Sequence, residues 1–169
     1  DCYVDADFAG LWPHEDKQDP TCVKSRTGFV ICVSDCPVIW ISKLQSEIAL
    51  STMEAEYNAL SYAMRSLLPM QQTVQAVASG IGISSEAVTI RTTIHEDNAG
   101  ALTLANMEAG RITPRSKHYA IKTHWFRSKL KPNNITVVKI DTLEQKADIL
   151  TKGLTKEKFE DICFQLCGW

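Results

Sequence analysis

Tyr3-Val4-Asp5-Ala6-Asp7-Phe8-Ala9-Gly10 is the stretch that decides the fold. Residues 2–6 predict a short buried strand, and Asp5 places a carboxylate on it. Three later motifs each hold one further acid: Glu56 in Ser51-Thr52-Met53-Glu54-Ala55-Glu56-Tyr57-Asn58-Ala59-Leu60, Asp97 in His95-Glu96-Asp97-Asn98-Ala99-Gly100-Ala101, and Asp148 in Lys146-Ala147-Asp148-Ile149-Leu150-Thr151-Lys152. Each acid closes a predicted strand or lies on a predicted helix. A fold that gathers four carboxylates without matching basic residues must neutralise them, usually with divalent metal. Two such ions hydrolyse phosphodiesters.

Length and composition favour an ordinary globular domain. A chain of 169 residues, 44% hydrophobic and 22% charged, is large enough for a proper core, and we expect a single domain over residues 1–169. The net charge of −2 predicts no general affinity for nucleic acid, so any such contact needs a local basic patch. The apolar runs are too short to span a bilayer, and the N-terminus lacks a signal-peptide pattern. Because the chain begins abruptly beside its first predicted strand, we expect a segment of a longer polyprotein.

The remaining pattern predicts a mixed α/β fold. Apolar, β-branched residues at 27–33 and 38–42, separated by turn residues, predict an antiparallel hairpin. From Ser51 the apolar residues recur at three and four positions, which predicts an amphipathic helix with Ser51 or Thr52 as N-cap and a kink or restart at Pro69. Further strands are expected at 89–96 and 135–140, and helices at 98–105, 117–130, 144–150 and 155–166.

In this order, the motifs closely resemble the ribonuclease H domain of Ty1/copia-type LTR retrotransposons. That family carries an Asp-Ala-Asp-aromatic-Ala start, a Ser-Thr-x-Glu-Ala-Glu-Tyr helix, an Asp-Asn-x-x-Ala strand end, a Lys-His segment and an Ala-Asp-Ile-Leu-Thr-Lys close, all of which are present here. The segment from Trp40 to Gln45 also matches, so the resemblance runs from about Tyr3 to Leu154. It implies an α/β, RNase H-like fold in which a central mixed five-stranded sheet is flanked by helices.

The resemblance also implies a function. A domain of this family cleaves the RNA strand of RNA/DNA hybrids, beside the reverse transcriptase domain of its polyprotein, in the cytoplasmic virus-like particle of the element. Residue by residue, Asp5, Glu56, Asp97 and Asp148 match the family's ligands for two Mg²⁺ ions, for which Mn²⁺ can substitute. Asp5 would bridge the ions, Glu56 and Asp97 would hold the leaving-group ion, and Asp148 would hold the water-activating ion.

Several of the acids have structural alternatives. Asp5 taken alone is equally typical of a turn, and Asp148 fits a helix N-terminal acid favoured by the helix dipole. Asp7 and Glu54 are expected to serve a loop or a helix cap instead of binding metal. Glu96, the neighbour of the third acid, should point to the opposite face of its strand.

The second clue is a basic segment. Between Arg111 and Lys131 the chain holds seven basic residues and no acid, which suits a surface that follows a phosphate backbone. The alternative is a solvated basic helix. Recognition of a hybrid would use backbone shape and 2′-hydroxyls instead of base edges. The residues expected to contact nucleic acid are Ser51, Asn98, Arg115, Lys117, His118 and Arg127.

Two other functions compete. A DNA strand-transfer enzyme of related fold would need a Glu in the segment that follows the second Asp, but no Glu lies between Glu108 and Glu144. A non-catalytic binding or tethering domain derived from the enzyme remains open, although all four acids are retained. The six cysteines lack zinc-knuckle spacing, and we expect reduced thiols in preference to a disulfide framework.

The chain departs from the family pattern at three places. Phe8 stands where Trp is usual, and Ala120 replaces an acid common after the Lys-His pair. Many ribonucleases H have a mobile His near the last carboxylate that helps proton transfer, whereas residues 140–148 contain none. This predicts a slower enzyme, or one in which water takes that role.

Overall fold

The framework of the protein is a five-stranded sheet with strand order β3-β2-β1-β4-β5. The computed structural model describes residues 1–12, 18–84, 87–107 and 120–168. Antiparallel pairing joins β1 (Cys2–Ala6) to β2 (Arg26–Val33) and β2 to β3 (Cys36–Leu44), while β4 (Thr92–Glu96) lies parallel to both β1 and β5 (Ile135–Lys139). The mixed five-stranded α/β fold expected from the sequence is confirmed.

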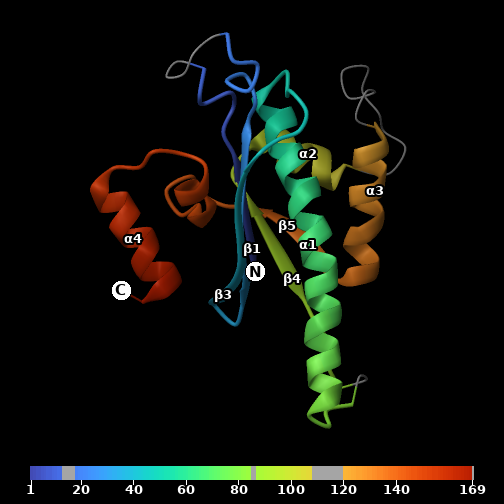
Figure 1. Ribbon diagram of the computed structural model, residues 1–169. Helices are drawn as coiled ribbons and strands as arrows, with labels where there is room; N and C mark the ends of the chain where they lie inside the picture. The colour runs from blue at the N-terminus through green and yellow to red at the C-terminus, as the bar shows by residue number, and fades with distance from the viewer. Residues whose placement is uncertain (13–17, 85–86, 108–119, 169) are drawn as a thin grey trace.

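Helices cover both faces of this sheet (Figure 1). On one face lie α1 (Thr52–Gly80), α2 (Ala99–Asn106) and α3 (Ala120–Leu130), followed by the short 3-10 helix η2 (Lys131–Asn133). On the other lie the 3-10 helix η3 (Lys146–Leu150) and α4 (Lys156–Cys167). The main core fills the space between α1 and the sheet, where Val4, Leu60 and Ile94 are fully buried.

The cysteines and the helix lengths also bear on expectations from the sequence. The six cysteines, all within the described residues, are unpaired. Of the helices in the described ranges, none is both long and apolar enough to cross a membrane.

The start of α1 follows the sequence prediction, but its continuation does not. Ser51 is the N-cap, and its hydroxyl accepts a hydrogen bond from the backbone N–H of Glu54 at 3.2 Å. The Glu54 carboxylate accepts from the Leu50 N–H, one residue earlier than a standard capping box. The expected restart at Pro69 is wrong, because α1 runs without interruption to Gly80. Pro69 lies on the exposed side of the helix, where water can satisfy the carbonyl that loses its partner.

The segment after β5 also differs from expectation. Residues 144–150 do not form an α-helix; they contain η3, which begins after Gln145. Gln145 is fully buried, and its amide nitrogen donates to the Val4 carbonyl of β1 at 2.8 Å while its oxygen accepts from the Ala147 N–H. These bonds fix the turn to the central strand and interrupt regular helix formation. The strand expected at 89–96 is likewise shorter and begins at Thr92.

A glycine lets η3 approach the sheet closely. A Cβ at Gly28 of β2 would lie 2.6 Å from Thr151 Cγ2 and 2.8 Å from Leu150 Cβ. Because Gly28 is the register partner of Asp5, this close approach brings the end of η3 over the carboxylate on β1.

Candidate active site

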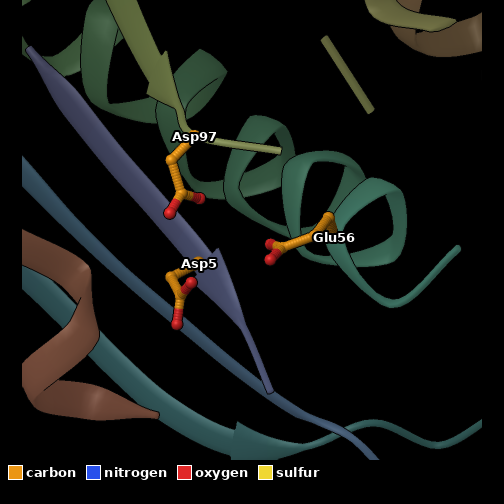
Figure 2. Close-up of side chains that lie close together, drawn as sticks. All are labelled: Asp5, Glu56 and Asp97. Atoms are coloured by element: carbon orange, nitrogen blue, oxygen red, sulfur yellow. The ribbon is translucent and has the colours of Figure 1, made fainter. Parts of the chain in front are cut away.

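Three of the four predicted acids converge at one edge of the sheet (Figure 2). Asp5 comes from β1, Asp97 directly follows β4, and Glu56 lies one turn into α1. Since β1 and β4 are parallel neighbours, their carboxyl ends meet at the same edge, and α1 lays Glu56 across it. One carboxylate oxygen from each residue lies within 4.8 Å of the other two.

The electrostatics of this cluster centre on Glu56. Its side chain is buried, and its Oε2 has no hydrogen-bond partner in the part of the chain that the structure describes. Burial, together with the charges of Glu96, Asp5 and Asp97, raises the pKa of Glu56 to about 10. Glu56 therefore keeps its proton at neutral pH unless a cation approaches. Burial also raises the pKa of Asp5, against the opposing effects of Lys152 and Thr151.

Glu96 belongs to the same electrostatic environment, which the sequence reasoning missed. Strand alternation is obeyed, because Glu96 shares a buried face of β4 with Ile94. That face is covered by α1, so the charge of Glu96 raises the pKa of Glu56 more than Asp5 or Asp97 does. Burial raises the pKa of Glu96 itself to about 8, and among the described residues its Oε2 lacks a hydrogen-bond partner. The signal available in the sequence was the strand alternation that places Glu96 on the same face as Ile94.

Asp148 lies apart from the three converging acids. It sits in η3 with 1% exposure, and both of its oxygens accept from lysines. Lys152 Nζ donates to Oδ1 at 2.7 Å and Lys158 Nζ to Oδ2 at 2.5 Å. Lys152 Nζ also reaches Asp5 Oδ1 at 3.0 Å, while the Thr151 hydroxyl donates to Asp5 Oδ2. The structure thus joins the fourth predicted ligand to Asp5 through an ammonium group.

Thr142 links the two ends of the site. Its hydroxyl donates to Asp97 Oδ2 at 2.8 Å, and its carbonyl accepts from Lys158 Nζ at 3.0 Å. Thr142 lies in the segment that lacks the histidine common in ribonucleases H. In this chain the segment instead connects Asp97 with the lysine that holds Asp148, a role that the sequence did not signal.

The residues predicted to contact nucleic acid divide into three groups. Ser51 and Asn98 are the N-caps of α1 and α2, and the Asn98 side chain accepts from the N–H groups of Gly100 and Ala101. Arg127 instead ties α3 to α2, because its Nε donates to the Leu104 carbonyl at 2.8 Å. The last group lies outside the described residues: Arg115, Lys117 and His118.

The converging acids fit a divalent cation. Hard cations such as Mg²⁺ prefer carboxylate oxygens, and the cluster offers three from different elements. A buried carboxyl without a partner is costly, and a cation beside Glu56 Oε2 would satisfy it.

Comparison with known proteins reveals relatives along almost the whole chain, although no family model matches it. The chain is 32% identical over 166 residues to the retrovirus-related Pol polyprotein from transposon TNT 1-94 of Nicotiana tabacum. It is 30% identical over 164 residues to that from transposon RE1 of Arabidopsis thaliana. This chain is covered to 98% and 97%, but spans only 11% and 10% of these relatives. The chain is a homologue of one segment of Ty1/copia retrotransposon Pol polyproteins.

Solved structures share the fold of this chain. LC11-RNase H1, solved in complex with an RNA/DNA hybrid, superimposes with a TM-score of 0.53 at 17% identity, covering 89% of this chain and 91% of that one. RNase H1 from Halobacterium salinarum gives 0.52 at 13% identity, with coverage of 95% and 96%. The fold is that of ribonuclease H. The resemblance drawn from the ordered motifs is therefore confirmed for both the relatives and the architecture.

Proposed function

We propose that this domain is a metal-dependent ribonuclease H, which cleaves the RNA strand of RNA/DNA hybrids during reverse transcription of a retrotransposon. The observation that carries the proposal is the convergence of Asp5, Glu56 and Asp97, in which Glu56 has an oxygen without a hydrogen-bond partner among the described residues. The fold adds support, because a structural neighbour was solved with such a hybrid. The natural partner is the reverse transcriptase domain of the same polyprotein, and the natural location is the cytoplasmic particle of the element.

The proposed roles of the four acids are those that the family resemblance implies. Asp5, Glu56 and Asp97 would hold one ion, and Asp5 and Asp148 would share a second. Bound Mg²⁺, or Mn²⁺ in its place, supplies a lowered pKa for an attacking water and stabilises charge on the phosphodiester. Thr142 positions Asp97 by donating to its Oδ2, which leaves Oδ1 available to a ligand. Ser51 caps α1, the helix that carries Glu56, and Asn98 caps α2 directly after Asp97; helix N-termini of this kind favour phosphate.

The decisive experiment is cleavage of a labelled RNA/DNA hybrid in Mg²⁺ and in Mn²⁺, with duplex DNA and duplex RNA as substrate controls. We expect cutting of the RNA strand of the hybrid alone. Asp97→Asn should lower the rate at least about a thousandfold, as expected for removal of a group that acts with its neighbours as a unit. Asp35→Asn is the matched control, because this exposed turn residue has φ of 64° and asparagine tolerates that conformation.

The alternative, a non-catalytic tethering domain, predicts a different outcome. Such a domain would bind the hybrid without cutting it in either metal, and Asp97→Asn would leave binding unchanged. A folded protein with that behaviour would exclude the enzymatic proposal for the isolated domain. Fusion to the neighbouring polymerase would then show whether cleavage depends on it.

A further inference from the structure

The ammonium of Lys152 lies between two predicted metal ligands. Lys152 Nζ is 3.0 Å from Asp5 Oδ1 and 2.7 Å from Asp148 Oδ1. These carboxylates belong to β1 and η3, and the sequence separation between Lys152 and Asp5 is 147 residues. The lysine therefore sits where the resemblance expects an ion shared by Asp5 and Asp148.

We propose that Lys152 holds the place of the second metal ion in the resting protein, so that this ion binds only by displacing the lysine. The inference rests on the proposed function, since it concerns the ligands of the same site. It predicts ordered loading of the two ions.

The burial of the partners explains why a cation is needed there. Asp5 has 0% exposure and Asp148 has 1%, and two ionised carboxylates at this depth require compensating charge. The Lys152 side chain is 37% exposed, so it enters the site from the solvent side. It can leave by rotation of its own flexible stem, without unfolding of η3 or β1.

Lys158 differs from Lys152 in what else it contacts. Lys158 Nζ donates to the Thr142 carbonyl as well as to Asp148 Oδ2, which anchors it to the loop. Within the described ranges, the hydrogen bonds of the Lys152 ammonium go only to Asp5 and Asp148. Lys152 is thus the exchangeable cation, and Lys158 the one that stays and orients Asp148.

Within the described residues, the Glu56 side of the site differs from the Asp148 side because no lysine pairs with its acid. Glu56 makes no ion pair with a described lysine or arginine, and its Oε2 is unpartnered. An ion at Asp5, Glu56 and Asp97 would therefore not compete with a described lysine for Glu56. We therefore expect tight binding of the first ion at these three acids and weaker binding of the second, against competition from Lys152.

Calorimetric titration of the metal-free chain with Mn²⁺ tests this ordering. Wild type should show two unequal binding events. Lys152→Met should raise the affinity of the weaker binding event about tenfold or more, because the ion would no longer compete with the Lys152 ammonium for Asp5 and Asp148. Lys152→Arg, which retains a cation, should keep the second event weak. Lys156→Met, which removes an exposed lysine of α4, should change neither event.

An unaltered or weakened second event in Lys152→Met would overturn the proposal, because it would mean that the lysine only holds the carboxylates in position. Wild-type protein supplies a test that does not depend on folding of a variant. The ¹⁵N resonance of the Lys152 ammonium, assigned by its loss in Lys152→Arg, should shift with the second Mg²⁺ equivalent and not with the first. A resonance that stays unchanged at saturating Mg²⁺ would equally refute displacement.

The outcomes separate this inference from the proposed function. If wild type cleaves the hybrid and Lys152→Met does not change metal affinity, the inference about Lys152 is wrong and the proposed function stands. A gain of metal affinity in Lys152→Met, without cleavage by any form, would support the inference and remove the function.

Discussion

Replacement of Glu56 by glutamine should stabilise the metal-free domain at alkaline pH while abolishing its proposed activity. The pKa of Glu56 is raised from 4.5 to about 10 by burial and by the neighbouring acids. At pH 8 the native state therefore keeps a proton that the unfolded chain has lost. A carboxyl group with a raised pKa makes the protein less stable as pH increases from about 4.5 towards about 10, since the native state binds more protons in that window.

The size of the effect follows from the pKa difference. Each unit corresponds to about 1.4 kcal/mol, so the span from pH 5 to pH 8 gives a ceiling of about 4 kcal/mol. Relaxation of the site and entry of water reduce such penalties, and we expect about 2 kcal/mol. For a domain of this size that corresponds to a rise of about 4 to 8 °C in Tm. At pH 5 the neutral carboxyl and the neutral amide should be nearly equivalent.

Thermal unfolding in a chelator at pH 5 and pH 8 measures this difference directly. Glu160→Gln serves as the control, because Glu160 is an exposed acid of α4 whose ion pair within the described residues is with Lys156, and it should change stability little at either pH. Added Mg²⁺ should stabilise wild type more at pH 8 than at pH 5 and should have little effect on Glu56→Gln. Equal Tm values for wild type and Glu56→Gln at pH 8 in chelator would show that Glu56 is ionised without metal, and the electrostatic reasoning would be wrong.

Two further substitutions test the supports of the site. Gly28→Ala should destabilise the fold by about 1 to 3 kcal/mol and lower metal affinity, because the added Cβ would clash with Thr151 and Leu150. Thermal unfolding and metal titration measure the two effects. Gly80→Ala is the matched control, because a Cβ there meets no described atom within 4 Å. Ser51→Asp should preserve the α1 cap and the Tm, because aspartate is also a good N-cap residue. It should weaken hybrid binding, measured by fluorescence anisotropy, because it places negative charge near phosphate. Equal affinity of the variant and wild type would show that Ser51 does not contact the hybrid.

The sequence predicted the parts of the site that depend on local pattern. Asp5 lies near the end of β1 and Asp97 directly follows β4, and the family order implies that these strands are neighbours. Glu56 lies on the face of α1 that carries Leu60 and Met64, so its inward direction follows from helical spacing. The convergence of these three acids therefore follows from residue pattern and family order together.

Other features depend on which element covers which face, and the pattern does not encode that. Strand alternation correctly separates the direction of the Glu96 side chain from that of Asp97. It does not reveal that α1 brings Glu56 to the face that carries Glu96. Pro69 carries a strong local signal against the helix, yet packing of the flanking turns on the sheet overrides it. The contact of Lys152 with Asp5 joins segments that are 147 residues apart, and it depends on the close approach that Gly28 permits.

The charge distribution explains how one site can fold without metal and still accept it. On one side of Asp5, Lys152 and Lys158 neutralise Asp148, so that side is satisfied in the resting protein. On the other side, Glu56 and Glu96 each have an oxygen without a hydrogen-bond partner among the described residues, and their pKa values are about 10 and about 8, so retained protons take the place of cations. Without metal, lysine ammonium groups compensate the acids on the Asp148 side, and protons neutralise the acids on the Glu56 side. A metal ion on the Glu56 side must displace a proton, whereas one on the Asp148 side must displace a lysine. Higher pH should therefore favour the first ion far more than the second, which ties the order of loading to the architecture of the sheet edge.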